Sequence, residues 1–138
     1  MNKKEVIKSL ESIIEALKAE EQEELITFDF GDGPVRAHQH KNPDGSMGGW
    51  VANTATVADT AYIGEYAKVF GNAKVFGNAK VSDNAVVADD AQVFGIAWVC
   101  DFAQVFGNAR VLGNAQVFGD AYVYGNAYVS GNAQVSGK

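Results

Sequence analysis

The chain has 138 residues, of which 47% are hydrophobic and 20% charged, a composition typical of one globular domain. Its formal net charge of −6 argues against direct binding to nucleic acid, which depends on a basic surface. The single cysteine, Cys100, excludes an internal disulfide framework. No apolar run reaches the roughly 18 residues of a membrane span, and none follows the first residues as in a signal peptide, so we expect a soluble, cytoplasmic protein without membrane contact.

Residues 3–24 have the pattern of an amphipathic helix, because apolar residues recur there at steps of three and four. Four of these residues also have heptad spacing, although over only two heptads. Two interpretations remain open: the helix caps or packs on the rest of the chain, or it pairs between protomers. The apolar positions are Val6, Ile7, Leu10, Ile13, Ile14 and Leu17, and the heptad subset is Ile7, Leu10, Ile14 and Leu17.

A β-hairpin is predicted next, because residues 26–30 and 35–40 alternate as strands around the turn residues 31–34. Residues 41–49 consist mostly of loop formers and predict a linker. We therefore expect residues 1–49 to form a capping or dimerisation module, followed by a second unit over residues 50–138. The hairpin could cover the edge of the sheet that follows it.

An internal repeat of six residues dominates the rest of the chain. Alanine recurs at every sixth position from Ala55 to Ala133, and each alanine is followed two residues later by valine or, at Ile63, isoleucine. A turn pair, most often Gly-Asn, completes each of the fourteen hexads. The pattern predicts a very short strand with two inward residues and a sharp turn. Such a unit buries its apolar face only by stacking on copies of itself, so the sequence predicts a solenoid.

This repeat resembles the hexapeptide-repeat, left-handed parallel β-helix family. In that family an aliphatic residue and a small residue four positions later both point inward, as Val69 and Ala73 or Val105 and Ala109 do under this reading. The resemblance covers Ala55 to Lys138. It implies three hexads per triangular coil, hence about five coils, and it alone supports the left hand. The expected fold is mainly β: a short left-handed parallel β-helix with an N-terminal α-helix and β-hairpin.

The residue after each inward valine should point to solvent, yet it is a large apolar residue in half of the hexads. Contiguous apolar patches are rare on monomers, so these rows are candidate interfaces. The alternative is that the rings stack on one another and only stabilise the sheets. One row contains Phe76, Phe94 and Leu112, a second contains Phe70, Phe106 and Tyr124, and the third face is poorest in aromatic residues.

The Gly-Asn turn is altered in two consecutive hexads, where Ile96 and Phe102 replace the expected asparagine. Because these residues lack the tolerance of asparagine for left-handed backbone, we expect some compensation there. Together with Phe94 and Trp98 they form the best candidate binding hot spot. The alternative is a hydrophobic corner covered by the N-terminal helix.

Catalytic chemistry is not indicated. His38 and His40, the only histidines, are expected to share a strand face with Arg36, and a zinc site there would need a third ligand, for which Asp29 is the one candidate. The hexapeptide family includes acyltransferases with a catalytic histidine in or beside the coils, but no histidine follows His40, so no catalytic residue is carried over. We expect no metal, no cofactor and no enzymatic activity; the alternative is a hexapeptide-type acyltransferase.

The expected function is non-catalytic protein binding. The chain stops within the repeat, and an open coil end favours pairing, so we expect a homodimer formed there or across an apolar row. Near-perfect Gly-Asn-Ala-x-Val repeats on a small chain resemble phage- and prophage-encoded β-helix proteins, some of which are counter-defence or anti-CRISPR proteins. The resemblance implies inhibition of a host complex such as a CRISPR–Cas effector, with a nucleic-acid-binding protein as partner. The alternative is a self-assembling structural oligomer.

Overall fold

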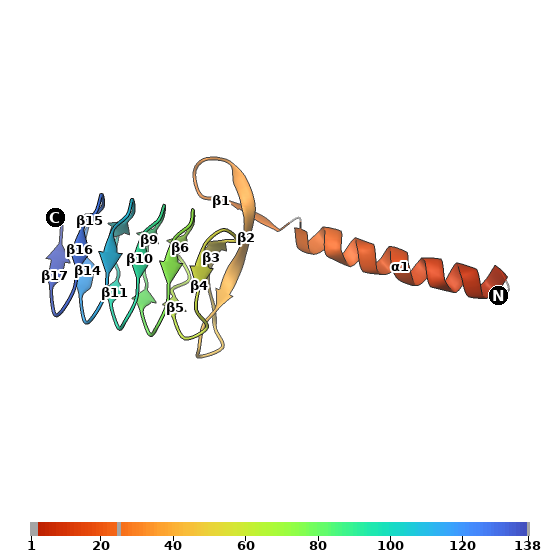
Figure 1. Cartoon of the computed structure of the whole chain (residues 1–138), viewed down its shortest axis with the longest axis horizontal. Helices are drawn as coiled ribbons and strands as arrows, with labels where there is room; N and C mark the ends of the chain where they lie inside the picture. Colours follow the sequence, from red (N-terminus) through yellow and green to blue (C-terminus); the bar gives the residue numbers. More distant parts are fainter. Residues whose placement is uncertain (1–2, 25, 138) are drawn as a thin grey trace.

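The computed structural model of this protein describes residues 3–24 and 26–137, including the side chains of residues 3–17 and 26–137. Within these residues a helix, α1 (Lys3–Glu24), precedes a β-solenoid of about five coils whose first coil carries a β-hairpin (Figure 1). The expected β-helix with an N-terminal helix and hairpin is therefore confirmed, while its left-handedness stays a prediction.

Three parallel sheets form the faces of the solenoid, and each coil contributes one strand to each face. Paired strands are 18 residues apart, as Val69 and Val87 are, which confirms three hexads per coil. The first face contains β3 (Met47–Ala52), β6 (Lys68–Val69), β9 (Val86–Val87), β12 (Gln104–Val105) and β15 (Tyr122–Val123). The second contains β4 (Thr56–Val57), β7 (Lys74–Val75), β10 (Gln92–Val93), β13 (Arg110–Val111) and β16 (Tyr128–Val129). The third contains β5 (Tyr62–Ile63), β8 (Lys80–Val81), β11 (Trp98–Val99), β14 (Gln116–Phe118) and β17 (Gln134–Ser136).

Stacked valines and alanines fill the interior of the solenoid. From Ala61 to Val117 the inward residue of every strand and the alanine of every turn are at most 1% exposed. Side chains this small pack without gaps at the narrow spacing of neighbouring strands. From Ala61 to Val117 the hexapeptide pattern therefore predicts every inward position correctly.

The hairpin extends the first face of the solenoid. Strand β1 (Thr27–Asp29) pairs antiparallel with β2 (Pro34–Lys41), and β2 pairs antiparallel with β3. The hairpin is confirmed, but β3 begins at Met47, within the residues expected to form a linker. Gly48 and Gly49 are strand residues because their backbone passes close over the first coil, where a Cβ on Gly48 would lie 2.1 Å from the carbonyl oxygen of Ile63.

The end of β2 and the residue after it cap the first coil. Asn42 Nδ2 donates a hydrogen bond to the backbone oxygen of Ile63 at 3.0 Å, and its Oδ1 accepts one from the Ile63 N–H at 2.8 Å. His40 Nε2 donates to the backbone oxygen of Ala61 at 2.8 Å. His40 and Asn42 are only 5% and 3% exposed. The expectation that the hairpin covers the open edge is confirmed, because these side chains replace a neighbouring strand beside β5.

The pairing of β2 with β3 shifts register between Gln39 and Lys41, where Gly48 and Gly49 of β3 lie opposite His40 alone. His40 is buried against the first coil, whereas Arg36 and His38 remain exposed. The two histidines therefore have different surroundings, while their common strand face stays a prediction.

From Gly71 to Gly131 the turns use left-handed backbone at one defined position. That residue is glycine in most of these turns, such as Gly95 at φ 70°, and aspartate at Asp83, Asp89 and Asp101, with φ between 56° and 58°. Ile96 and Phe102 come one position later and have ordinary backbone, so the expected need for compensation there is wrong. Glycine and aspartate are among the residues that tolerate positive φ, and the preceding position already holds one of them.

Candidate protein-binding surface

Some side chains of the predicted apolar rows stack on one another, so only part of their surface is exposed. On the second face the rings of Phe76 and Phe94 stack with centroids 4.7 Å apart, and Leu112 follows one coil later. Phe94 and Leu112 are partly buried, and Phe76 is 37% exposed. This row is continuous. The contact between its two rings stabilises the sheet, and the exposed part of the row forms an apolar surface.

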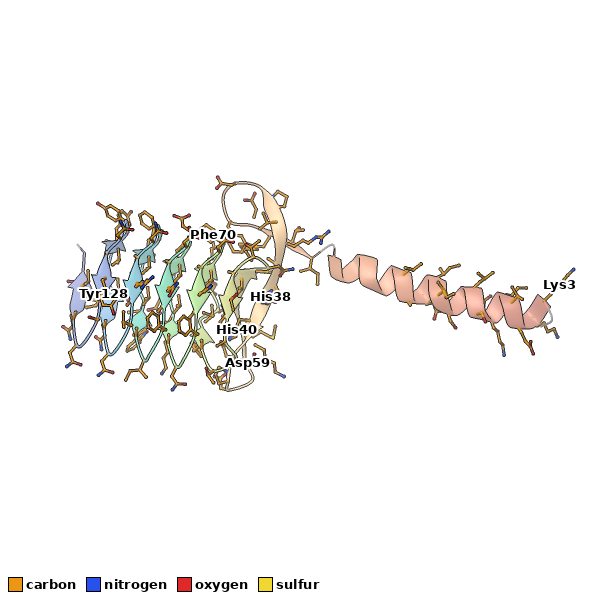
Figure 2. The ribbon with its side chains drawn as sticks, in the orientation of Figure 1. Lys3, His38, His40, Asp59, Phe70 and Tyr128 are labelled. Carbon is orange, nitrogen blue, oxygen red and sulfur yellow. The ribbon has the colours of Figure 1, made fainter. Side chains whose placement is uncertain are left out.

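The row on the first face is divided into two clusters. Phe70 stacks on Phe30 of the hairpin at 4.9 Å, while Phe106 stacks on Tyr124 at 5.4 Å. Between them lies Ala88, which is too small to continue the stacking and is 5% exposed. Figure 2 shows Phe70 near the hairpin end of the solenoid and Tyr128 towards the other end. This face therefore presents two separate aromatic clusters.

The most exposed apolar residues predicted from the altered turns lie on a single coil. Ile96 is 59% exposed, Trp98 42% and Phe102 60%. Ile96 and Phe102 occupy the corners on either side of β11, and Trp98 lies on β11 itself. We call these three residues the apolar strip. The exposure of both corners contradicts the alternative that the N-terminal helix covers them.

Polar residues border the apolar strip on both neighbouring coils. Lys80 and Gln116 are in register with Trp98, one on each side. Trp98 Nε1 donates a hydrogen bond to Ser82 Oγ at 2.8 Å, which fixes the orientation of the indole ring. An apolar centre within a polar rim is the usual arrangement of an interface hot spot. The residues at the corresponding positions are Asn78, Lys80 and Asn84 on the preceding coil and Asn114, Gln116 and Asp120 on the following one.

The fold does not require apolar residues at the two corners. The backbone N–H groups of Ile96 and Phe102 donate to the next coil at 3.0 Å, as the asparagines do at the same position in other coils. Their side chains take no part in these bonds. The fourth predicted member, Phe94, lies on the second face against Phe76, so the structure brings three of the four together.

Three exposed tyrosines were not predicted as surface candidates. Tyr66, Tyr122 and Tyr128 are 60–68% exposed. Tyr122 and Tyr128 precede an inward valine, and Tyr66 lies in a turn, so a rule limited to the residue after valine misses them. Tyr122 packs edge-on against Phe106 and enlarges that cluster.

A groove of about 410 Å³ lies between the hairpin and the first coil. Its lining is mostly apolar and includes Phe30, Val35 and Phe70. The charged residues that line it are Asp32 and Arg36. The groove is an apolar surface at the hairpin end, separate from the apolar strip.

The two histidines form separate hydrogen bonds and do not lie in a common site. His38 Nδ1 donates to Asn53 Oδ1 at 2.8 Å, whereas His40 is buried in the cap. The carboxylate of Asp29, the expected third ligand, accepts hydrogen bonds from the N–H groups of Gly31 and Gly33 at 2.7 and 3.2 Å. In the described part of the chain these three residues are not a group that could hold a metal ion.

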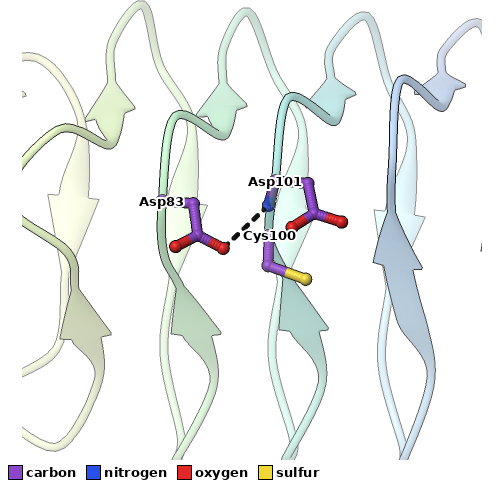
Figure 3. A group of neighbouring side chains, drawn as sticks. All are labelled: Asp83, Cys100 and Asp101. Carbon is purple, nitrogen blue, oxygen red and sulfur yellow. Dashed lines mark hydrogen bonds between the residues drawn. The ribbon is translucent and has the colours of Figure 1, made fainter.

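One such group does occur, at the corner between the third and first faces. Potential ligand atoms of Asp83, Cys100 and Asp101 lie within 4.8 Å of one another (Figure 3). Asp83 Oδ2 already accepts a hydrogen bond from the Asp101 N–H at 3.1 Å. Burial, followed by the charges of Asp101 and Asp83, raises the pKa of the Cys100 thiol above its ordinary value. A thiol that keeps its proton is a poor nucleophile and a poor ligand, so turn stabilisation accounts for this group.

Comparisons with known proteins agree with the repeat architecture. The YdcK beta solenoid repeat matches residues 103–119 and 121–137, about a quarter of the chain. Each matched segment spans three consecutive strands, β12–β14 and β15–β17, and so corresponds to one coil. Searches of curated proteins and of solved structures gave no match. Among the described residues, no helix combines the length and the apolar character needed to cross a membrane. The chain is thus a β-solenoid repeat protein, and its last two coils are similar to the YdcK beta solenoid repeat.

Proposed function

We propose that this protein is a non-catalytic binding protein that holds a protein partner on the apolar strip. The observation that carries this proposal is the exposure of Ile96, Trp98 and Phe102, at 42–60%. The solenoid forms its backbone hydrogen bonds at these positions without any contribution from an apolar side chain. Large exposed aromatic residues within a polar rim provide most of the binding energy in many interfaces. The strip gains that energy only when a partner removes it from water.

Charge next to the strip favours a basic partner. Phe102 lies on the corner between the third and first faces, where four acidic residues follow one another along the solenoid. A surface of this sign speeds association with a basic protein and disfavours nucleic acid itself. The acidic residues of this corner are Glu65, Asp83, Asp101 and Asp120.

The narrower proposal is an accessory protein of a phage or mobile element that inhibits a host complex such as a CRISPR–Cas effector. It is supported by the resemblance of repeat style and size and by the net charge of −6, since effectors of this kind carry basic nucleic-acid-binding surfaces. The direct test is target cleavage by purified effectors with and without the protein. Unchanged cleavage across the effectors of the natural host would refute this narrower proposal alone.

The binding proposal is tested by affinity capture of the tagged chain from lysate of its natural host, followed by measured affinity for the captured partner. Trp98→Asp should weaken binding by about 2 kcal/mol or more, roughly 30-fold, because truncating a buried anchor costs this much. Gln104→Asp is the matched control, because Gln104 lies at the equivalent outward position of β12 on another face. Equal affinities of the two variants would contradict binding through the strip.

A self-assembling structural oligomer is the second candidate function. The observation that favours it is the continuous row of Phe76, Phe94 and Leu112 on the second face. Under this function Phe76→Asp should lower the molecular mass measured by light scattering, while Trp98→Asp should leave it unchanged. If the Phe76→Asp variant has the same molecular mass in solution as the unaltered protein, assembly through this row is excluded.

A further inference from the structure

Helix α1 has an apolar face without a partner among the described residues. We call this face the α1 stripe; each of its side chains is 41–56% exposed. Figure 1 shows α1 extending away from the solenoid. Helices in proteins owe most of their stability to packing of an apolar face, and α1 lacks such packing among the described residues. The stripe consists of Val6, Ile7, Leu10, Ile13, Ile14 and Leu17.

We propose that the α1 stripe pairs in antiparallel orientation with the α1 stripe of a second copy of this chain. The heptad subset fits such a pair in one register, with Ile7 opposite Leu17 of the partner subunit and Leu10 opposite Ile14 of the partner subunit. This register centres the pair at the level of Ser12, which lies on the side of each helix away from its partner, and overlaps the two stripes along nearly their whole length. Each copy then uses the same surface, as closed two-fold dimers do.

The charge distribution along α1 selects the antiparallel orientation. Its first turns contain Lys3, Lys4 and Lys8, whereas its last turn contains no basic residue. The glutamates of the C-terminal end are Glu20, Glu21, Glu23 and Glu24. Antiparallel pairing brings the lysine-rich end of each helix beside the glutamate-rich end of the other. Parallel pairing would instead place like charges together at both ends, which destabilises neighbouring helices.

The available area suits a dimer that forms and dissociates readily. Half-exposed aliphatic side chains, six from each helix, offer apolar contact on the order of 1,000 Å², near the lower limit for a specific interface. Antiparallel pairing also places the two solenoids at opposite ends of the helix pair, each about 33 Å long, so they do not obstruct one another. Both apolar strips remain free for binding, so the dimer is bivalent.

The mass of the full chain over a concentration series, measured by sedimentation or light scattering, tests the dimer. We expect a mass approaching twice 14.7 kDa. Leu10→Asp should weaken dimerisation at least tenfold, whereas Ser12→Asp, which adds the same charge on the opposite side of the helix, should leave it nearly unchanged. A monomer at all concentrations, or a dimer that survives Leu10→Asp but is lost with Phe76→Asp, would overturn the proposal. Unchanged solenoid circular dichroism verifies that each variant is folded.

Orientation is tested by disulfide formation in a Cys100→Ser background, which has no other cysteine. The L10C chain and the I14C chain carry tags of different length, so that a crosslink between unlike chains differs in size from one between like chains. Each chain is oxidised alone and in a mixture with the other. Antiparallel pairing in the stated register predicts a crosslink between the two unlike chains, and S12C chains should remain uncrosslinked. Crosslinking of L10C with itself in preference to I14C would show parallel pairing and overturn the proposal. Neither readout depends on a partner of the apolar strip, so this proposal and the binding proposal can fail separately.

Discussion

The cap of the first coil gives the sharpest test of how this fold is held together. Asn42→Ala removes both hydrogen bonds to Ile63 and one to Ser46 Oγ at 3.1 Å. The N–H and carbonyl of Ile63 then lie buried without partners, at a cost of roughly 1–3 kcal/mol for each group. Allowing for partial access of water, we expect a loss of about 3 kcal/mol in the free energy of unfolding.

Two measurements detect this loss in the free energy of unfolding. A coil at the end of a solenoid can open on its own, so hydrogen exchange of the Ile63 amide should accelerate on the order of 100-fold. Thermal unfolding should shift downwards by roughly 10 °C if the coils unfold together. Asn108→Ala is the matched control, because Asn108 is an exposed corner residue whose substitution should change stability by less than about 0.5 kcal/mol. Equal effects of the two substitutions would refute the capping role of Asn42.

Asn42→Asp adds a dependence on pH with a defined sign. The carboxylate keeps the shape and the acceptor for the Ile63 N–H but faces the Ile63 carbonyl oxygen without a proton to donate. The folded state should therefore favour the protonated carboxyl, and its pKa should rise above that of the unfolded chain. Stability should fall as pH rises through that range and recover in acid, whereas the Asn42→Ala variant should show no such recovery. A variant that stays equally unstable on acidification would contradict this account.

Three further predictions concern the turns and the thiol. Gly95→Ala should lower the free energy of unfolding, measured by denaturant titration, by about 2 kcal/mol, because φ is 70° and the new Cβ would lie 2.9 Å from the Gly113 nitrogen. Gly95→Asn should lower it by less. Asp101→Ala should be less stable than Asp101→Gly by about 1 kcal/mol, since only glycine relieves the strain at φ 58°, and equal stabilities would disprove that strain. Cys100 should alkylate more slowly than a free thiol below its raised pKa, and Asp83→Asn should speed the reaction; a rate equal to that of a free thiol would contradict the raised pKa.

The candidate surface shows where sequence patterns lose their predictive value. Outward residues such as Phe94 and Trp98 look alike in the repeat, yet Phe94 stacks on the neighbouring coil and Trp98 remains 42% exposed. The difference depends on which residue lies 18 positions away, Phe76 in one case and Lys80 in the other. A pattern read along the chain detects an outward position, while its exposure depends on the neighbouring coils.

The repeat by itself determined the solenoid and the inward valines and alanines, because a six-residue strand and turn buries its apolar side only by stacking on copies of itself. The hairpin followed in the same way from its local alternation. The three faces followed from the resemblance to the hexapeptide-repeat family. Only the tertiary structure decided the burial of His40 and Asn42 in the cap, the register shift between β2 and β3, and the place of Gly95 and Asp101 as the left-handed turn residues. These features depend on contacts between segments that are about 20 residues apart or on the backbone geometry they impose, and such contacts leave no periodic signal in a single sequence.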